Sequence, residues 1–274
     1  MDPQLDGRIP AHVRRERIVE LLVQRGAGSL PVEELAPALG VSAATVRRDL
    51  AHLHTEGRIT RTYGGAALGT ASAEVSVRQR ELSNAAQKDA IARAAVEFVE
   101  PDQVVILDAG STTERLARLL RAVPGLTVFT NGVAALNTLL EYGDTDVVVL
   151  GGRVRRINQT ITGEAATDTV RGLFADVAFI GADAVDPGRG VASRTLEQSG
   201  LKTLMAQSAR QVFVLADSSK LDAAWTSYWS PMDRPWTLLT DDGADPELIE
   251  SFRAADPRLQ VITCPVAVEA AATG

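Results

Sequence analysis

The residues of this chain that are best suited to chemistry lie in short polar turns, each of which follows an apolar run. The first turn, residues 108–113, reads Asp-Ala-Gly-Ser-Thr-Thr and directly follows Val104–Leu107. Glycine lets a backbone approach an anion closely, and the N–H groups at the start of a helix can donate to it together with side-chain hydroxyls. By itself such a turn is also an ordinary strand-to-helix connection with a Ser/Thr cap, so the assignment depends on what lies beside it.

Four further turns of this kind follow later apolar runs, and they lie at residues 130–132, 151–152, 181–183 and 217–220. Turns at the carboxyl ends of neighbouring parallel strands converge on one cleft. Together they would supply hydroxyls, backbone N–H groups, two carboxylates and a lysine, which suits a small polyol that carries a phosphate. The candidate ligand-binding residues are Asp108, Gly110, Ser111, Thr112, Thr113, Asn131, Gly132, Gly151, Gly152, Gly181, Asp183, Asp217 and Lys220.

The elements that must position these turns alternate between short apolar strands and helices. Alternation of this kind is typical of right-handed βαβ units. A long amphipathic helix is predicted at residues 84–99, before the first strand. The fold class predicted for this part is α/β, a doubly wound and mainly parallel sheet, with strands at 103–107, 126–129, 146–150, 176–180, 211–216, 236–240 and 258–263.

The first part of the chain has a different order of predicted elements, in which short helices follow one another directly. Apolar residues recur at helical spacing, and glycines stand where such helices can end. We predict helices at residues 14–26, 32–39 and 42–54, then a strand at 58–63 that is followed by two glycines. This order of elements is that of an N-terminal winged helix–turn–helix domain.

The third predicted helix has the features of a DNA-reading helix. Ser42 can cap its start, and Ala43 and Ala44 are small enough for the helix to approach base edges closely. Arg47 and Arg48 come one turn later, where contacts to phosphate or guanine are both possible, and two arginines of the wing could reach a flanking phosphate or the minor groove. The candidate DNA-contacting residues are Ser42, Ala43, Ala44, Thr45, Arg47, Arg48, His52, Arg58, Arg61, Gly64 and Gly65.

Other interpretations of this segment stay open. Three short helices and a hairpin can be a mere packing domain, and winged helices also serve as protein-interaction modules. His12, His52 and His54 could be taken for a metal cluster, but solvated histidines on an outer helix face are the commoner case. Asp49 cannot favour DNA, and we expect it to orient a neighbouring arginine.

The composition is that of a globular chain of 274 residues, 45% hydrophobic and 23% charged, and this length favours two domains. No apolar run is long enough to cross a membrane, the N-terminus has no apolar signal core, and Cys264 has no second cysteine to pair with. These features predict a cytoplasmic protein without a membrane segment, a metal or a cofactor. We expect domains at residues 1–66 and 84–274, joined by a linker at 67–83.

The net charge of −7 is unevenly divided along the chain. Residues 1–70 carry a net charge of +1, with all of their positive charge on arginine, and residues 71–274 carry −8. Arginine suits bidentate hydrogen bonding to phosphate or guanine. The charge alone would not support an interaction with DNA, so that prediction depends on the pattern of the helices.

The N-terminal motifs resemble those of a known family. Residues 41–50, Val-Ser-Ala-Ala-Thr-Val-Arg-Arg-Asp-Leu, followed by Arg61 and the run Gly64-Gly65-Ala66, closely resemble the winged helix–turn–helix of the DeoR family of bacterial transcription regulators. This match covers about residues 14–66, and the rest of the chain fits the family from end to end. The resemblance implies that the partner is double-stranded operator DNA.

The second half resembles the sensor domain of these regulators, which is similar in fold to ribose-5-phosphate isomerase. Residues 181–186 are close to the isomerase pattern Gly-Ala-Asp-Glu-Val-Asp, and residues 217–220 match its Asp-Glu-Ser-Lys. Ile180 and Ala184 stand where the enzyme has Asp and Glu, and the lysine of its glycine run has no counterpart. Isomerisation needs a carboxylate that moves a proton and a cation that steadies the enediolate. The departures therefore imply a binding pocket that has lost catalysis.

One further departure concerns the helix after this loop. Family regulators carry Glu-Ala-x-x-Lys there, whereas this chain has Gln198-Ser199-Gly200-Leu201-Lys202, with Glu197 one residue early. Lys202 is therefore an additional candidate ligand-binding residue, and a solvated position on the helix surface is the alternative.

Taken together, these features predict a transcriptional regulator, a repressor of a carbohydrate-utilisation operon. We expect it to act as a homo-oligomer, a dimer or a tetramer, whose DNA binding is switched by a phosphorylated sugar effector. No residue is expected to be catalytic. Two alternatives stay open: a sugar-phosphate isomerase-like enzyme fused to a DNA-binding domain, and a nucleoid or interaction module whose α/β domain only dimerises.

Overall fold

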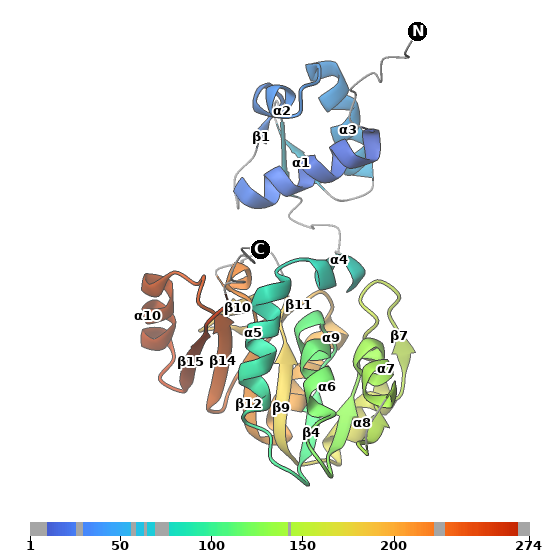
Figure 1. Cartoon of the computed structure of the whole chain (residues 1–274), viewed down its shortest axis with the longest axis vertical. Helices are drawn as coiled ribbons and strands as arrows, with labels where there is room; N and C mark the ends of the chain where they lie inside the picture. The colour runs from blue at the N-terminus through green and yellow to red at the C-terminus, as the bar shows by residue number, and fades with distance from the viewer. Residues whose placement is uncertain are drawn as a thin grey trace, which may run out of the picture. The chain divides into compact units, whose positions relative to one another are not determined.

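A computed structural model of the chain describes residues 10–25, 30–55, 59–62, 65–68, 77–141, 144–221 and 228–267. The chain divides into two compact units, an N-terminal unit (Met1–Val75) and a second unit (Ser76–Gly274). Figure 1 shows the elements of each unit.

The N-terminal unit contains the three predicted helices and a small antiparallel sheet. The helices are α1 (Ala11–Arg25), α2 (Val32–Ala38) and α3 (Ala43–Thr55). Their apolar faces meet in one core, where Ile18, Leu35 and Leu50 are buried. The strands β1 (Leu30–Pro31), β3 (Gly65–Leu68) and β2 (Ile59–Thr62) pair in that order. The arrangement confirms the predicted helix–turn–helix with a β wing.

Strands β1 and β3 were not predicted, because neither has a strand pattern of its own. β1 is two residues long, and β3 is the small-residue run Gly-Ala-Ala-Leu. A Cβ atom on Gly65 would lie 2.2 Å from the carbonyl oxygen of Leu30. Glycine is therefore required there for β3 to close on β1.

The arginine that Asp49 orients comes from α1 and not from its own helix. Arg14 Nε lies 2.5 Å from Asp49 Oδ2, and Arg14 Nη2 lies 3.1 Å from Asp49 Oδ1. The hydrogen bond to Asp49 raises the pKa of Arg14 above its ordinary value. This pair holds α1 against α3, while Arg47 and Arg48 on α3 are exposed.

The second unit is built on a sheet in which, among the described residues, seven strands pair in the order β15-β14-β12-β9-β4-β5-β6. Each neighbouring pair is parallel. The predicted strands are confirmed, with ends that differ by one or two residues. They are β4 (Val104–Leu107), β5 (Thr127–Thr130), β6 (Asp146–Val149), β9 (Ala175–Gly181), β12 (Ala209–Leu215), β14 (Trp236–Asp241) and β15 (Leu259–Cys264).

The strand order reverses between β4 and β9. From β4 the chain moves outward through β5 to β6, then returns to β9 and moves outward the other way through β12, β14 and β15. At the reversal, Leu107 of β4 pairs with Phe179 of β9. Connections that leave in opposite directions open a crevice at the carboxyl ends of two such strands, which is where open α/β sheets bind ligands.

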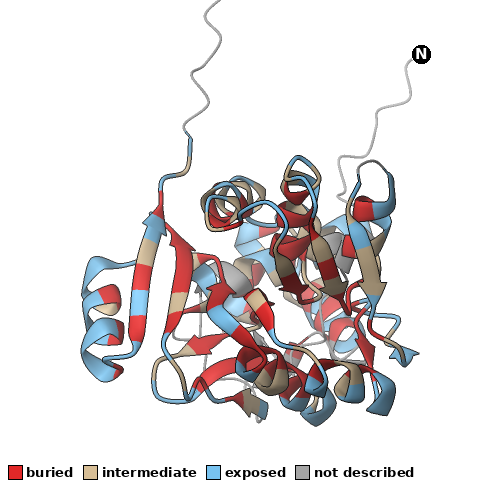
Figure 2. Ribbon diagram, turned by 90° about the horizontal axis from the view of Figure 1, so that it is seen from below, coloured by how far each residue is buried: buried red, intermediate tan, exposed pale blue. Residues whose placement is uncertain are grey.

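Helices cover both faces of this sheet, and two apolar clusters hold them there (Figure 2). The helices α5 (Ala85–Val96), α6 (Ser111–Leu120) and α7 (Val133–Glu141) pack on one face, over Phe179 and Phe213, whose rings are 5.4 Å apart. The helices α8 (Glu164–Arg171), α9 (Leu196–Gln207) and α10 (Pro246–Ala255) pack on the other. Successive residues of a strand point to opposite faces. Each continuous apolar strand therefore packs against the helices on both sides of the sheet.

Short strands outside the main sheet were not predicted. β7 (Arg153–Val154) pairs with β8 (Ile161–Thr162), and β11 (Gly190–Ser193) pairs with both β10 (Val185–Asp186) and β13 (Tyr228–Ser230). Elements of two to four residues have no periodicity to detect, and their pairing depends on contacts between distant segments. No helix within the described ranges has the length and apolar character needed to cross a membrane.

The stretch 67–83, predicted as a linker, contains ordered structure at both of its ends. β3 extends to Leu68, and α4 (Val77–Leu82) forms a short helix within the second unit. Residues 69–76 between them lie outside the described residues. The predicted helix at 84–99 is α5, which begins after Asn84, a residue with a left-handed φ of 51°.

Cys264 at the end of β15 gives a first testable prediction. It is 1% exposed, and burial, with the charges of Asp241 and Asp242, raises the pKa of its thiol to about 11. Because the thiolate is the reactive form, we expect the folded chain at pH 8 to react with a thiol reagent more than ~100-fold more slowly than the urea-unfolded chain. Equal rates in the folded and unfolded states would contradict the buried position.

Candidate functional site

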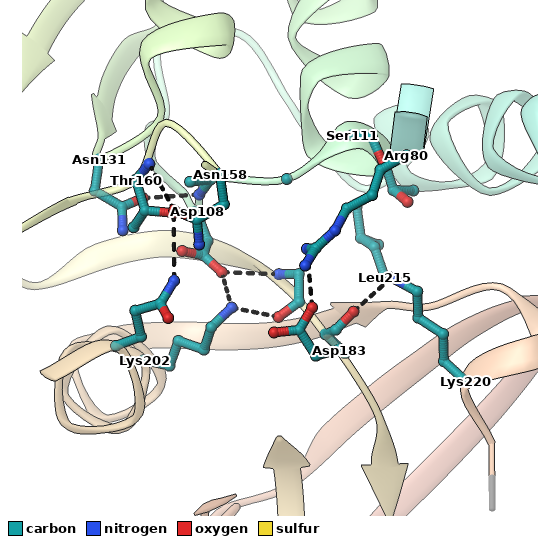
Figure 3. Close-up of a pocket in the computed structure, with 16 residues that line it drawn as sticks. Arg80, Asp108, Ser111, Asn131, Asn158, Thr160, Asp183, Lys202, Leu215 and Lys220 are labelled. Carbon is teal, nitrogen blue, oxygen red and sulfur yellow. Dashed lines mark hydrogen bonds and ion pairs between the residues drawn. The ribbon is translucent and has the colours of Figure 1, made fainter. Parts of the chain in front are cut away.

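A pocket opens where β4 and β9 end, at the reversal of the strand order (Figure 3). About 640 Å³ of space lies between its lining residues, with the open solvent at its mouth included. Its walls come from α4, the start of α6, α9 and the turns that follow several strands. The lining residues are Arg80, Asp108, Ala109, Gly110, Ser111, Thr112, Asn131, Asn158, Thr160, Gly181, Ala182, Asp183, Gln198, Lys202, Leu215 and Lys220.

Asp108 ties together the two strands that flank the reversal. Its Oδ2 accepts a hydrogen bond from Gly181 N at 3.1 Å and forms an ion pair with Lys202. Lys202 Nζ also donates to Gly181 O at 2.5 Å. The Asp108 and Lys202 side chains are 1% and 9% exposed. α9 therefore turns Lys202 into the pocket, and the alternative of a solvated position on the helix surface does not hold.

The start of α6 supplies the backbone donors predicted from the Gly-Ser-Thr-Thr sequence. Gly110 is the N-cap residue of α6, and this position carries no side-chain cap. The N–H groups of a first helical turn have no partner within their own helix, and here they lie at the edge of the pocket together with Ser111 and Thr112, an arrangement that suits an anion. Thr113 instead donates its hydroxyl back to Gly110 O at 3.0 Å and is fully buried.

Charged side chains lie beside this helix start. Arg80 Nη1 is 2.9 Å from Asp183 Oδ1, and Lys220 Nζ donates to Ala182 O at 2.6 Å. Burial lowers the pKa of Lys220. Burial alone would raise the pKa of Asp183, but the charges of Arg80 and Lys220 outweigh it and hold that pKa below its ordinary value. Asp183 is therefore an ion-paired carboxylate.

The other side of the pocket carries neutral polar groups. In Figure 3, Asn131, Asn158 and Thr160 lie on one side of Asp108, whereas Arg80 and Lys220 lie on the other. Gln198 Nε2 donates to Thr160 Oγ1 at 3.4 Å, and Asn131 Oδ1 accepts from Ala109 N at 2.8 Å. Amides and hydroxyls both donate to and accept from sugar hydroxyls. One side of the pocket thus suits an anion and the other suits hydroxyl groups.

The few lysines of the chain lie at or near this pocket. Among 28 basic residues the chain has only three lysines, Lys88, Lys202 and Lys220. Lys202 and Lys220 line the pocket. Lys88 is 2% exposed, and burial, followed by the charge of Lys220, lowers its pKa to about 8. A compact ammonium differs from the planar arginine fork, so two of the three lysines give this pocket point charges, and the third lies close enough for the charge of Lys220 to act on it.

Most of the predicted site residues meet at the pocket, and five do not line it. Those that line it are Asp108, Gly110, Ser111, Thr112, Asn131, Gly181, Asp183, Lys202 and Lys220. Thr113, Gly132, Gly151, Gly152 and Asp217 are outside the described lining. A Cβ on Gly132 would lie 3.0 Å from Ala109 Cα, and one on Gly152 would lie 2.3 Å from Thr162 O. These two glycines serve close backbone packing.

Asp217 does not line the pocket but holds the turn that carries Lys220. It is 1% exposed, accepts a hydrogen bond from Asn84 Nδ2 at 2.9 Å and another from Ser219. Burial alone would raise the pKa of Asp217, but the charge of Lys220 and these hydrogen bonds hold it below its ordinary value. Asp217 thereby fixes the turn η1 (Ser218–Lys220), which carries Lys220.

Sequence reasoning missed four polar residues of the lining. Arg80 falls in the predicted linker, and Asn158 and Thr160 lie between two predicted strands, without a pattern of their own. Gln198 occupies the position where the family pattern has glutamate. That replacement was the available signal, since Glu197 is exposed and pairs with Arg153 at 3.0 Å.

The candidate DNA-contacting face is the outer side of α3. Ser42 caps this helix, because its Oγ accepts a hydrogen bond from Thr45 N at 3.2 Å. The exposed residues near it are Ser42, Ala44, Arg47, Arg48 and His52, while Ala43 and Thr45 are partly buried. The apolar residues Val46, Leu50 and Leu53 point into the core.

The predicted wing contacts are less completely described. Arg58 and Gly64 lie outside the described residues, as does the side chain of Arg61 on β2. Gly65 is buried, so its part in a DNA surface is to let the wing close.

Comparison with known proteins matches each unit to a family. The model of the DeoR-like helix-turn-helix domain matches residues 14–71, and that of the DeoR C terminal sensor domain matches residues 83–242. The chain is 36% identical to a putative aga operon transcriptional repressor of Escherichia coli O157:H7, over 88% of this chain and 90% of that protein. It is 30% identical to the glycerol-3-phosphate regulon repressor of Escherichia coli K12, over 76% of this chain and 81% of that protein.

A solved D-ribose-5-phosphate isomerase in complex with phospho-erythronic acid is 25% identical over 49% of this chain and 52% of that chain, with a TM-score of 0.37. The two family models and the curated relatives show that this chain belongs to the DeoR family of DNA-binding transcriptional regulators.

Proposed function

We propose that this regulator represses a carbohydrate-utilisation operon and that a phosphorylated sugar or polyol, bound in the pocket at the ends of β4 and β9, switches its DNA binding. The observation that carries the proposal is the polarity of the pocket. Arg80, Lys220 and the start of α6 form a cationic side that fits a phosphate. Asn131 and Thr160 lie on the side that fits hydroxyls.

The negative net charge of the second unit does not oppose an anionic ligand. Three cations, Arg80, Lys202 and Lys220, line the pocket against two carboxylates, Asp108 and Asp183. Exposed charges farther away than a Debye length, ~8–10 Å at physiological salt, are largely screened. The printed name of one relative, a glycerol-3-phosphate regulon repressor, agrees with a phosphorylated polyol as effector.

We propose further that the pocket binds without catalysing a reaction. An isomerase requires a carboxylate that is free to take up a proton, whereas Asp108 pairs with Lys202 and Asp183 pairs with Arg80. Ile180, at a position where the enzyme pattern carries a carboxylate, is fully buried. Appreciable turnover of pentose phosphates by the purified chain would refute this part of the proposal.

The DNA-binding surface that we propose is the exposed side of α3 with the wing. One short recognition helix makes too few contacts for operator specificity. We therefore propose that the chain acts in the cytoplasm as a homo-oligomer, on a palindromic or repeated operator. In this arrangement the N-terminal unit (Met1–Val75) binds DNA, and the second unit (Ser76–Gly274), which includes Arg80, binds the effector and a second copy.

A thermal-shift screen tests the effector. The panel holds triol, pentose, hexose and amino-sugar phosphates, the unphosphorylated parent of each, and inorganic phosphate. A compound at about 100 times its Kd stabilises the folded chain by ~2.7 kcal/mol, which raises Tm by ~2–4 °C per kcal/mol for a domain of this size. We expect a response to one phosphorylated compound and none to its parent. A flat response across the panel would refute a sugar phosphate as the effector.

Two variants locate the response in the pocket. Lys220→Ala removes a pocket cation and is expected to abolish the shift. Arg171→Ala removes an exposed cation of the same unit, which pairs with Asp168 on α8, and is expected to leave the shift unchanged. Loss of the response in both variants would show a general charge effect instead of a site.

A further inference from the structure

Helix α4 is the first described element after residues 69–76, which connect it in sequence to the N-terminal unit. It is six residues long. A helix of this length is not stable alone, so its contacts with the rest of the second unit decide whether it forms. Several of those contacts come from elements that also build the pocket.

Among the α4 side chains that the structure describes, that of Arg80 lines the pocket. This side chain is 20% exposed, and its Nη1 lies 2.9 Å from Oδ1 of Asp183, whose side chain is 12% exposed. Two residues after α4, Asn84 donates to Asp217, which precedes the turn that carries Lys220. The pocket end of β9 and the Lys220 turn therefore both hold the segment that contains α4.

Two basic residues hold the backbone of the same segment. Lys88 of α5 donates to Arg80 O and, at 2.6 Å, to Ser83 O. Arg115 of α6 donates to Glu81 O at 2.9 Å. The last carbonyls of a helix have no partner within it, so these bonds fix the carboxyl end of α4 to the helices beside the pocket.

The Arg80 guanidinium lines the pocket beside the start of α6. Five N–H groups in a planar fork suit an anion with several oxygens, and a phosphate at the start of α6 would enter a pocket that Arg80 already lines. Lys220, on the same side of the pocket, also carries charge but lies on the turn η1 and not on α4. Arg80 is therefore the cation that joins the anion site to α4.

We propose that Arg80 binds the anionic group of the effector and that this contact stabilises the docking of α4. Ligand binding in the pocket thereby stabilises the segment that leads to the DNA-binding unit. The inference rests on the proposed effector. A ligand that contacts Arg80 only when α4 is docked must favour the docked state by its differential affinity. Asp183 holds Arg80 in place while the pocket is empty.

Hydrogen exchange of the full-length chain, followed by mass spectrometry on peptides that cover residues 77–84, tests this inference. The probes are inorganic phosphate, ribose 5-phosphate and glycerol 3-phosphate, each at saturation, with binding measured separately by calorimetry. We expect a bound probe to slow exchange in this segment. Arg80→Gln should weaken binding by about tenfold or more and abolish the slowing.

Asp183→Asn separates the ion pair of Arg80 with Asp183 from its proposed contact with the anion. Without the carboxylate, the free chain should exchange faster at residues 77–84, and a bound probe should slow it by a larger factor than in the unsubstituted chain. Arg93→Gln, an exposed position on α5, is the matched control and should change neither the affinity nor the exchange.

The outcomes distinguish this inference from the proposed function. The inference is wrong if a probe binds but exchange at residues 77–84 is unchanged, or if Arg80→Gln keeps full affinity and protection. In either case α4 does not respond to ligand binding through Arg80, and the effector site still stands. If none of the probes binds the unsubstituted chain, the inference falls together with the effector on which it rests.

Discussion

Lys202→Met is expected to destabilise the second unit by about 3–5 kcal/mol, because it leaves Asp108 buried without its charge partner. The Asp108 side chain is 1% exposed, and its remaining contact is the hydrogen bond from Gly181 N. Methionine keeps the length and the apolar stem of lysine, so the change removes charge with little loss of volume. The pair also links the ends of β4 and β9, so the loss should affect the sheet and not only the pocket.

Urea unfolding followed by tryptophan fluorescence measures this effect, because all three tryptophans, at positions 225, 229 and 236, belong to the second unit. The double variant Asp108→Asn/Lys202→Met removes both charges and is expected to recover much of the lost free energy of unfolding. Arg171→Met, at an exposed pair with Asp168, should cost less than ~1 kcal/mol. A Lys202→Met variant as stable as this control would show that the buried pair contributes nothing.

Arg47→Ala and Arg48→Ala are each expected to weaken operator binding by about fivefold to 150-fold, which corresponds to the ~1–3 kcal/mol typical of a direct base contact. Both side chains are exposed on α3. Because Arg14 and not Arg48 neutralises Asp49, the loss of Arg48 should leave the stability of the N-terminal unit nearly unchanged. An arginine that contacts phosphate instead should lower affinity for all sequences and reduce the salt slope by ~1.

Fluorescence anisotropy with a DNA site selected from a random pool, repeated over a series of salt concentrations, measures both quantities. A complex that neutralises roughly six phosphates should lose about 10³ in affinity between 50 and 200 mM salt. Arg17→Ala is the control, since this arginine lies on α1 and pairs with Glu20. Unchanged affinity in both α3 variants would place the DNA contact on another surface of the unit.

Local patterns in the sequence determined the elements and the topology class. The seven strands of the main sheet were predictable because each is an apolar run with a polar turn at its end, and α3 because its apolar stripe and Ser42 cap lie within one short segment. The turn before α6 was recognisable for the same reason. Each of these features depends on residues close together in the chain, where periodicity and capping act.

Only the tertiary structure decided which distant residues meet. The pairing of Arg14 with Asp49, the entry of Arg80 into the pocket and the inward direction of Lys202 join residues that are far apart in sequence or that lie on elements without a visible pattern. Asn158 and Thr160 likewise reach the site through chain packing. The three lysines could be counted in the sequence, but the ion pair of Lys202 with Asp108 depends on the reversal of strand order between β4 and β9, which brings segments about 70 residues or more apart to one crevice.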